Sequence, residues 1–481
     1  MTPTKPTWDL VVVGGGTAGI IGAKTAAGLG ARVALIERDR PGGDCLWTGC
    51  VPSKALLASA SAAAHTRRAR ELGVTATAVE VDFRRVMAHI HDAVEAIAPT
   101  DSPEALRTAG VQTVHAEARF TSPRTIAAEG RTLQFHRALL ATGATPTLPP
   151  TPGLPEADPW TSETIWELTR LPRRLVIIGG GTTGSELGQG FARLGSEVTI
   201  VERAPRLLPA EDPDASRIVR TALEGDGVTI LTGHRLAEVK GCPRGAGEAV
   251  LVGGDGRYRL EYDILLIAIG RTPRTADLGL DVAGIELDQR GTVRVDAALR
   301  TTNRRVWAAG DLTGHPQLTH LAGVHASVAA TNAVLGLRRT IDTAAIPRVT
   351  FTDPEVAAVG APTWNDSGPA PRTVTQAHQH IDRAITDRLT AGFSRLVLGH
   401  RNRVTGATVV GPRAGESLPE LTLAVRKKLT TGDLTATTHA YPTYGDGPWH
   451  AAIQDVQHRL RRPAARAAIH TATAVRRALS R

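Results

Sequence analysis

Short apolar stretches alternate with a longer helical run at the start of the chain. Residues 8–13 (WDLVVV) are almost wholly apolar, residues 20–29 form a proline-free run rich in alanine and isoleucine, and residues 32–36 are largely apolar again. A strand, a helix and a second strand of these lengths, joined by glycine turns, are typical of a β-turn-α-β unit in a parallel sheet. The pattern predicts an α/β fold.

The same alternation returns further along the chain. Residues 175–178 predict a strand, residues 185–194 a helix, and residues 198–201 the next strand. Two more apolar stretches, 137–144 and 264–271, each end in a turn of small residues, and each is expected to close the sheet of its unit. This internal repeat predicts two domains of one fold.

The remaining stretches have other patterns. Residues 55–72 and 82–98 predict helices, and residues 111–135 alternate like an antiparallel meander with a turn at Ser122 and Pro123. From about Ile346, short strands and one helix predict an antiparallel α+β domain. The predicted division is 1–150, 151–272, 273–345, 346–462 and a basic tail, 463–481.

The turn of the first unit is rich in glycine. Gly14 permits a tight turn, Gly16 lets backbone amides approach a pyrophosphate, and Gly19 lets the helix pack closely on the strand. Thr17 and Ala18 lie at the start of the helix, whose partial positive charge favours phosphate. Glu37, eighteen residues after Gly19, is placed to bind a ribose. The first unit is therefore predicted to bind a dinucleotide.

The second unit carries the same loop with Gly179, Gly181, Thr183 and Gly184, and its second strand ends in Glu202. Two such loops predict two dinucleotides, one of which passes hydride to the other. A carboxylate at the position of Glu202 favours a ribose with a free 2′-hydroxyl, so NADH is slightly preferred. Arg203 and Arg206 follow closely and could bind the 2′-phosphate of NADPH.

Three further small-residue turns are candidate cofactor contacts. Thr142 and Gly143 follow the strand at 137–144, and Gly270 follows its counterpart in the second unit. Gly310 and Asp311 follow a short apolar strand; Asp311 is either a cofactor contact or an ordinary turn residue.

Two of the three cysteines, Cys45 and Cys50, lie in the glycine-framed segment 42–54 (GGDCLWTGCVPSK). A close pair in a reducing compartment indicates catalysis or metal binding rather than a structural disulfide. No second cysteine pair or histidine pair accompanies it, so no metal site is predicted. Cys242 lies in a loop of the second unit and is expected to be a bystander.

Composition adds little that is specific. Hydrophobic residues make up 42% and charged residues 21%, no apolar run is long enough to span a membrane, and the N-terminus has no signal-peptide pattern. A cytoplasmic protein without a membrane partner is expected. The net charge of +9 is partly local, because seven arginines and no acid lie between Arg459 and Arg481. This tail is interpreted as a solvated end, with a nucleic-acid or membrane-surface role as the alternative.

These motifs together resemble the class I pyridine nucleotide–disulfide oxidoreductases, and the order FTDPEVAAVG, RLVLG, YPTYGDG most resembles mercuric reductase and its relatives, with dihydrolipoamide dehydrogenase also similar. The resemblance covers the chain to about residue 460. It implies an α/β fold with two Rossmann-like domains, for FAD and for NAD(P), and a C-terminal α+β dimerisation domain. It also implies a homodimer with an active site shared between subunits.

The resemblance also assigns roles. It implies that Cys50 contacts the flavin, that Cys45 meets the substrate, and that Lys54 lies near the flavin in an ion pair with Glu186. Disulfide reductases of the family place a histidine five residues before a glutamate; here those positions hold Tyr441 and Asp446. Tyrosine is a poor base at neutral pH, and His439 and His450 are the nearby alternatives for proton transfer.

The predicted function is an FAD-dependent NAD(P)H oxidoreductase that passes electrons through Cys45 and Cys50 to a small acceptor, a metal ion or a disulfide. Two alternatives stay open. One is a quinone or dye reductase that acts directly from the flavin. The other is a redox-sensing or DNA-associated flavoprotein that uses the basic tail.

Overall fold

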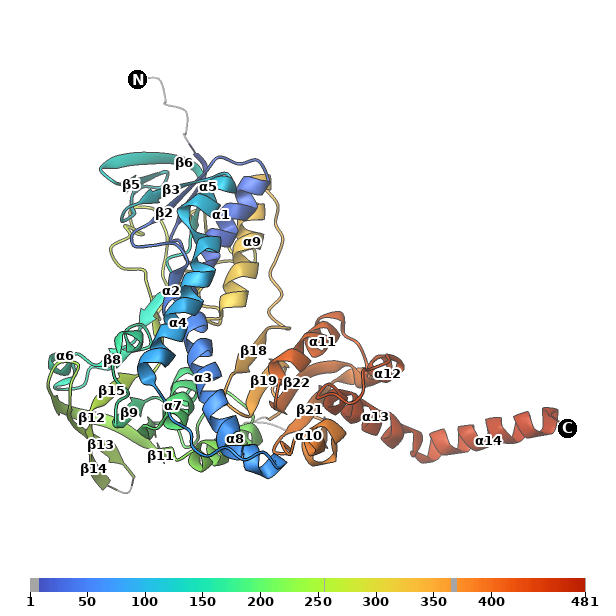
Figure 1. The fold of residues 1–481 in the computed structure, drawn as a ribbon. Helices are drawn as coiled ribbons and strands as arrows, with labels where there is room; N and C mark the ends of the chain where they lie inside the picture. Colours follow the sequence, from blue (N-terminus) through green and yellow to red (C-terminus); the bar gives the residue numbers. More distant parts are fainter. Residues whose placement is uncertain (1–7, 255, 365–369, 481) are drawn as a thin grey trace. The chain divides into compact units, whose positions relative to one another are not determined.

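The computed structural model describes residues 8–254, 256–364 and 370–480 and divides the chain into two compact units. The first comprises Met1–Arg203 and Asp226–Ile341, and the second comprises Ala204–Gly225 and Asp342–Arg481. Figure 1 shows the path of the chain through both. The finer division into five parts stays a prediction.

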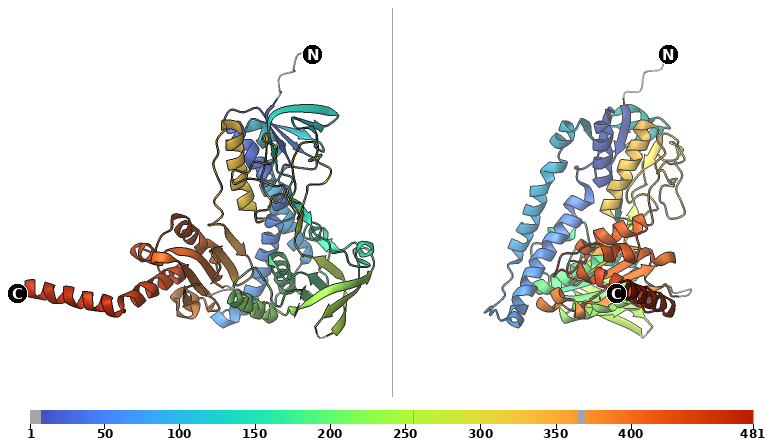
Figure 2. Two further views of the ribbon diagram at one scale, coloured as in Figure 1. Left: turned by 180° about the vertical axis from the view of Figure 1, so that it is seen from behind. Right: turned by 90° about the vertical axis from the view of Figure 1, so that its right-hand side faces the viewer.

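The first unit contains a seven-stranded sheet in the order β3-β2-β1-β6-β5-β4, with β17 also paired to β6. The parallel strands β2, β1 and β6 are almost fully buried where they meet, and helices α1 and α9 pack side by side against them (Figures 1 and 2). The elements of this layer are β1 Trp8–Val13, α1 Thr17–Gly28, β2 Val33–Glu37, β3 Val111–His115, β4 Arg119–Ser122, β5 Thr125–Ala128, β6 Arg131–Leu140, β17 Val306–Ala308 and α9 Thr319–Leu335.

The predicted meander at 111–135 is correct only in part. Strands β4, β5 and β6 are antiparallel neighbours, with the expected turn after Ser122. Strand β3 instead pairs in parallel with β2, from Val33 opposite Val111 to Glu37 opposite His115. The alternation along the sequence did not distinguish a parallel edge strand from the first strand of a meander, because both have one buried face.

Two long helices and four short ones lie between β2 and β3 in the chain. Helix α3 begins at Cys50, ahead of the stretch 55–72, and packs against α4. The N-terminus of α4 is capped by Asp82, whose side chain accepts hydrogen bonds from the amides of Arg84 and Arg85. The elements of this layer are α2 Gly43–Trp47, α3 Cys50–Arg68, α4 Phe83–Ile97, α5 Pro103–Thr108 and the short 3₁₀ helices Ala69–Leu72 and Ala98–Asp101.

A second, parallel sheet has the order β11-β10-β9-β15-β8, and helix α7 packs beside it. A three-stranded antiparallel sheet, β12-β13-β14, and the two-stranded ribbon β7-β16 complete the first unit. The elements are β7 Ala144–Pro146, α6 Leu154–Ala157, β8 Trp160–Thr161, the 3₁₀ helix Ile165–Glu167, β9 Arg174–Ile178, α7 Thr182–Leu194, β10 Glu197–Glu202, β11 Thr229–Thr232, β12 His234–Gly241, β13 Gly247–Gly253, β14 Gly256–Tyr262, β15 Ile264–Ile267 and β16 Arg271–Pro273.

The stretches 137–144 and 264–271 do not close their sheets as expected. Strand β6 lies between β1 and both β5 and β17, and strand β15 lies between β9 and β8. Strands β5 and β17 lie outside β6, and strand β8 lies outside β15. This central position agrees with the complete burial of Leu139 and Leu266.

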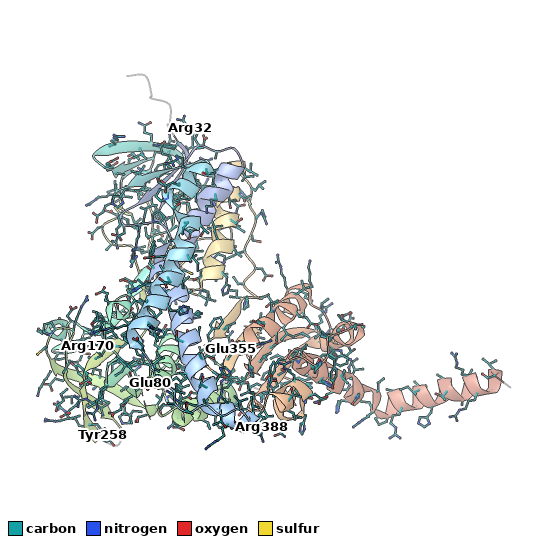
Figure 3. The ribbon with its side chains drawn as sticks, viewed as in Figure 1. Arg32, Glu80, Arg170, Tyr258, Glu355 and Arg388 are labelled. Carbon is teal, nitrogen blue, oxygen red and sulfur yellow. The ribbon has the colours of Figure 1, made fainter. Side chains whose placement is uncertain are left out.

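The second unit is built on a five-stranded antiparallel sheet, β18-β19-β22-β21-β20. Glu355 at the start of β19 accepts a hydrogen bond from the Gly415 amide of α11 (2.9 Å), which ties that helix to the sheet (Figure 3). The elements are α8 Pro213–Gly225, β18 Pro347–Thr350, β19 Glu355–Gly360, β20 Thr373–Ala377, α10 Asp382–Thr386, β21 Phe393–Leu398, β22 Val404–Gly411, α11 Ala414–Lys427, α12 Thr431–Ala436, α13 Asp446–Leu460, α14 Pro463–Leu479 and the 3₁₀ helices His378–His380 and His400–Asn402.

The parallel parts of the two large sheets, β3-β2-β1-β6 and β11-β10-β9-β15, have one strand order, and with the antiparallel sheet of the second unit they confirm the predicted α/β fold class. Among the described residues, none of the helices combines the length and the apolar character needed to cross a bilayer.

Candidate functional site

The first glycine loop joins β1 to α1 in a tight turn. Gly14 has φ +101°, and its amide donates to the carbonyl of Ile36 (2.8 Å). A Cβ atom at Gly19 would lie 1.8 Å from the Gly14 carbonyl oxygen, so only glycine fits there. The Gly15 amide donates to Glu37 Oε2 (2.5 Å), which fixes the carboxylate beside the loop.

The second loop repeats this geometry between β9 and α7. The Gly179 amide donates to the Val201 carbonyl (2.8 Å), and a Cβ atom at Gly184 would lie 1.8 Å from the Gly179 carbonyl oxygen. The Gly180 amide donates to Glu202 Oε2 (2.7 Å). The two loops thus present the same set of backbone amides and a carboxylate at the end of the neighbouring strand.

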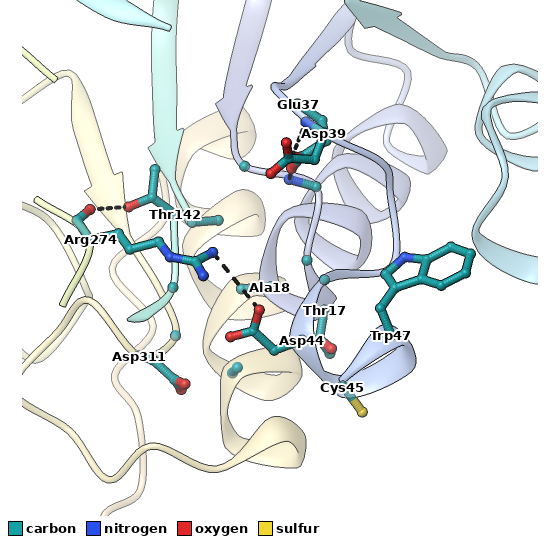
Figure 4. Close-up of a pocket in the computed structure, with 18 of the residues that line it drawn as sticks. Thr17, Ala18, Glu37, Asp39, Asp44, Cys45, Trp47, Thr142, Arg274 and Asp311 are labelled. Atoms are coloured by element: carbon teal, nitrogen blue, oxygen red, sulfur yellow. Dashed lines mark hydrogen bonds and ion pairs between the residues drawn. The ribbon is translucent and has the colours of Figure 1, made fainter. Parts of the chain in front are cut away.

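A cavity of about 550 Å³ surrounds the first loop (Figure 4). The cavity is lined by most of the residues that the sequence predicted as contacts of the first dinucleotide, and by several residues that it did not predict. The predicted ones are Gly14, Gly16, Thr17, Ala18, Glu37, Thr142, Gly143, Gly310 and Asp311. The residues that sequence reasoning missed are Arg38, Asp39, Arg40, Asp44, Trp47, Thr48, Glu163, Arg274, Thr319 and Ala322.

The missed residues make one wall of the cavity charged. Arg274 forms an ion pair with Glu163 (3.1 Å) and lies 3.8 Å from Asp44, which is also paired with Arg271. Burial raises the pKa of the Asp311 carboxyl on the same cavity. A glycine loop at a helix N-terminus, fixed carboxylates and cationic side chains are the donor and acceptor set that a dinucleotide with a pyrophosphate requires. The cavity therefore fits FAD.

The cysteine pair lies beside this cavity on two separate helices. Cys45 lines the cavity from the short helix α2, and Cys50 is the first residue of α3. Thr48 and Gly49 break the helix between them, and Gly42 and Gly43 enter α2 with φ of 116° and 61°. The glycine-framed segment that carries both cysteines is therefore a short helix, a break and the start of a second helix. Both cysteines are thiols in this structure.

The Cys50 sulfur is surrounded by groups that stabilise a thiolate. Thr319 is the first residue of α9, and its Oγ1 lies 3.3 Å from Cys50 Sγ. The Cys45 thiol, Thr319 and the charge of Lys54 together lower the pKa of the Cys50 thiol to about 6. The pKa of the Cys45 thiol is raised, first by its hydrogen bond to Cys50 and then by burial. The surroundings thus favour the thiolate form at Cys50 and the thiol form at Cys45.

Lys54 and Glu186 connect the two dinucleotide units. Lys54 Nζ on α3 lies 2.8 Å from Glu186 Oε2 on α7, and the Glu186 side chain is 4% exposed. The Lys54 side chain is 37% exposed, so the pair joins a buried carboxylate to a half-exposed ammonium group, and losing Lys54 would remove the cation that compensates a desolvated carboxylate. The ion pair predicted by the resemblance is therefore present, between the cysteine helix and the helix of the second loop.

The remaining predicted residues of the second loop lie as follows. Gly181 is the N-cap of α7, Thr183 is exposed on its first turn, and Gly270 has φ 122° before β16. Arg203 is exposed next to Glu202, whereas Arg206 donates to the Pro209 carbonyl (3.0 Å). Cys242 is exposed in the turn between β12 and β13.

Tyr441 and Asp446 lie in the second unit, before and at the start of α13, and they do not contact each other through a hydrogen bond of the described structure. Tyr441 is 71% exposed, and its hydroxyl donates to Asp382 Oδ2 (2.7 Å), which raises the pKa of the phenol. Asp446 is buried and accepts from the Thr443 amide (3.1 Å). The carboxylate that accompanies Tyr441 is therefore Asp382.

The two histidines near Tyr441 are engaged elsewhere. His439 Nδ1 faces the Thr437 carbonyl (2.9 Å), and its Nε2 faces Glu420 Oε1 (2.9 Å). Its ring stacks on Trp449, which also contacts the ring of His450. His439 thus anchors the segment before Tyr441 to α11.

Comparison with known proteins explains this arrangement. The family model described as pyridine nucleotide-disulphide oxidoreductase matches residues 8–326, and the dimerisation domain of the same family matches residues 346–452. A mercuric reductase of Bacillus cereus is 36% identical over 444 residues, which cover 92% of this chain and 70% of that protein. A dihydrolipoyl dehydrogenase of Thermus scotoductus is 35% identical over 460 residues, 93% of this chain and 97% of that protein.

Two solved structures are similar across the chain. LpdA of Mycobacterium tuberculosis has a TM-score of 0.83 at 29% identity and covers 92% of this chain and 99% of its own. The HOCl-induced flavoprotein disulfide reductase RclA of Escherichia coli, solved as a Cu(II) complex, has a TM-score of 0.79 at 27% identity and covers 91% of this chain and 98% of its own. This chain belongs to the pyridine nucleotide-disulphide oxidoreductases and is an FAD-dependent enzyme of that family that uses NAD(P)H.

Proposed function

We propose that the enzyme uses NADH, with NADPH as the weaker donor, to reduce a thiophilic metal ion through Cys45 and Cys50. The observation that carries the proposal is the geometry of the thiol pair: Cys45 lines the FAD cavity, and Cys50 Sγ lies 3.3 Å from Thr319 Oγ1, which together with Lys54 favours a thiolate there. Thiolates are the preferred ligands of soft metal ions.

The chain's residues supply binding and orientation. The loop amides, Glu37 and the charged wall at Arg274 would hold FAD in the first unit, and the second loop with Glu202 would hold the nicotinamide nucleotide. FAD, when bound, supplies two-electron chemistry between a nicotinamide and a disulfide. Lys54, held by Glu186, would place a positive charge beside that chemistry.

The cysteines then carry the two electrons. Reduction of a Cys45–Cys50 disulfide breaks the sulfur–sulfur bond and leaves a Cys50 thiolate and a Cys45 thiol, which takes up one proton. Transfer of two electrons, to one Hg(II) ion or to two Cu(II) ions, re-forms the disulfide and releases the proton. Thr319 and Lys54 hold the Cys50 thiolate between these two events.

The surroundings of Tyr441 support a metal ion over a disulfide. Reduction of a disulfide produces thiols that need protons, and Tyr441 already donates its proton to Asp382. Its raised pKa makes it a poor acid at neutral pH. A metal ion requires ligands rather than protons. The mercuric reductase relatives and the Cu(II) complex of RclA point to the same class of acceptor.

We also propose a homodimer in which Tyr441 of one subunit lies at the cysteine pair of the other. The match of residues 346–452 to the family's dimerisation domain supports this assembly. In this homodimer the exposed Tyr441 ring of one subunit would cover the cysteine pair of the other.

The test compares wild type with Cys45→Ser and Cys50→Ser, each loaded with FAD. Anaerobic NADH should produce long-wavelength absorbance in wild type and Cys45→Ser, and Cys50→Ser should lack it because the thiolate is gone. NADH oxidation coupled to Hg(II) or Cu(II) should fall at least about a hundredfold in both variants.

The outcomes separate the rival functions. A small disulfide that is turned over faster than either metal ion would contradict the metal assignment but keep the dithiol. Quinone turnover that both serine variants retain, without any metal turnover in wild type, would favour direct reduction from the flavin and contradict the proposal.

A further inference from the structure

Helix α14, Pro463–Leu479, lies outside the enzyme fold described so far. The family's dimerisation domain matches only to residue 452. Every residue of α14 is exposed except Ala465, which is half-buried, and α13 is the main neighbour of the helix. Figures 1 and 2 show it continuing beyond α13 without covering the sheet of its own unit. A helix of seventeen residues gains little stability in water by itself, so an exposed one requires another surface.

One side of α14 is apolar. At about 100° per residue, its large apolar side chains and three alanines fall within an arc of about 120°. Ile469, Val475 and Leu479 are 46%, 53% and 83% exposed. The opposite side carries Arg466, His470 and Arg477, whereas Arg476 lies within the apolar arc, about 20° from its edge. The apolar side consists of Ala465, Ala468, Ile469, Ala472, Val475 and Leu479.

The charge of this segment is of one sign. No acidic residue follows Asp455 in the sequence. Arg459 is used internally, because it pairs with Asp455 (3.1 Å) and donates to Thr431. Within the described residues, no ion pair is formed by Arg461, Arg462, Arg466, Arg476 or Arg477. The helix therefore presents uncompensated positive charge around an exposed apolar strip.

We propose that α14 lies in the plane of an anionic lipid bilayer, with its apolar side in the headgroup region and its arginines at the phosphates. An amphipathic helix with arginine on its polar side is the type that binds such surfaces. A nucleic acid would use the arginines but not Ile469, Val475 and Leu479. Pairing with α14 of a second copy would bring like charges together. The proposal does not depend on the electron acceptor.

The experiment uses the FAD-loaded full chain and three triple variants. Ile469→Ser with Val475→Ser and Leu479→Ser removes the apolar strip and keeps the charge. Arg466→Gln with Arg476→Gln and Arg477→Gln removes charge and keeps the strip. Ala467→Ser with Ala474→Ser and Ala478→Ser is the matched control, because these alanines lie on the other side and carry a similar helix-propensity cost.

Binding is measured by co-sedimentation with vesicles of phosphatidylcholine alone or mixed with phosphatidylglycerol. Wild type and the alanine-to-serine control should bind the mixed vesicles and not the neutral ones. The apolar and arginine triples should each bind at least about tenfold more weakly. Unchanged FAD content and NADH oxidation confirm that each variant is folded.

Three results would overturn the proposal. The first is a wild-type protein that does not bind the mixed vesicles. The second is an apolar triple that binds the mixed vesicles as tightly as wild type does, which would indicate contact through the arginines alone. If wild type and the apolar triple also bind a short DNA duplex more tightly than the vesicles, the helix would be assigned to nucleic acid. The third is a loss of self-association in the apolar triple, seen by sedimentation velocity, which would assign the strip to a second copy.

Discussion

At the scale of single residues, the reactivity of Cys50 depends on neighbours that are distant in sequence. Thr319 follows it by 269 positions, yet its hydroxyl lies 3.3 Å from the sulfur. Lys54 is one helical turn away and is held by Glu186 from the second dinucleotide unit. The local sequence supplies the helix terminus, and the tertiary fold supplies the hydrogen bond that completes the thiolate site.

Removing the Thr319 hydroxyl should make the thiolate harder to form. We expect Thr319→Val to raise the pKa of Cys50 from about 6 by about one unit, because a hydrogen bond to a charged group is lost. The long-wavelength absorbance of the reduced, FAD-loaded enzyme, followed from pH 5 to pH 9, gives the midpoint. It should appear as pH rises through about 6 in wild type and at higher pH in the variant. Thr319→Ser should behave as wild type; an identical midpoint for valine would contradict the role of this hydroxyl.

The preference for NADH is expected to depend on Glu202. Glu202→Ala should raise the KM for NADH by about tenfold or more, since a charged hydrogen bond to a ribose is lost, and should change the KM for NADPH less. Glu202 also accepts from the Gly180 amide (2.7 Å), so Glu202→Gln serves as the control that keeps an acceptor there. Equal changes for both nucleotides would mean that the carboxylate only supports the loop.

At the scale of elements, the two glycine loops make the same contacts and are predicted to bind different molecules. A Cβ atom at Gly19 or at Gly184 would lie 1.8 Å from the carbonyl oxygen of the first glycine in its own loop. The same substitution therefore disturbs each strand-to-helix junction equally and can be used to tell their ligands apart.

Gly19→Ala should yield protein with little FAD after purification. Gly184→Ala should keep FAD and show a KM for NADH raised at least about tenfold, because only the second junction is displaced. Flavin absorbance per chain and steady-state kinetics measure the two effects. Loss of FAD in both variants would show that the substitutions act on folding rather than on the individual sites.

The sequence predicted regular elements better than their connections. Glycine spacing and apolar runs located both loops, since their geometry needs particular residues at particular positions. The pairing of β3 with β2 and the interior places of β6 and β15 depend on strands contributed by distant segments. The break at Thr48 and Gly49 was indicated only by the glycine.

The candidate site was predictable where chemistry is local. Cys45, Cys50 and Glu37 lie in recognisable motifs, whereas Thr319 and Arg274 stand in ordinary polar surroundings without a motif. The partner of Tyr441 was also missed. Asp382 lies 59 positions away, and an aspartate at the start of a short helix is usually interpreted as a cap.

At the scale of the whole molecule, each compact unit contains a buried histidine that resists protonation. Burial lowers the pKa of His325 in the first unit and of His378 in the second from 6.5 to about 4. His378 donates or accepts at Ser394 Oγ (3.0 Å), and its Nδ1 has no partner in the described structure. Both units therefore hold a neutral imidazole in their interior.

Stability should fall in mild acid for this reason. The unfolded chain binds a proton at His378 as pH drops below 6.5, and the folded chain does not until about pH 4. The contribution is complete above pH 6.5 and is lost toward pH 4, by up to about 3 kcal/mol. Thermal unfolding midpoints between pH 7 and pH 4 should drop less steeply in His378→Gln than in wild type. A parallel pair of curves would contradict the assignment.

The exposed turn that carries Cys242 gives the molecule an internal counting standard. The chain has three cysteines, and two of them are the candidate redox pair. Oxidised protein should therefore take up one alkylating label per chain, on Cys242, and reduced protein three. The mass of intact, labelled chains then reports the fraction of enzyme in each redox state directly, even within a mixture and without reference to the colour of the cofactor.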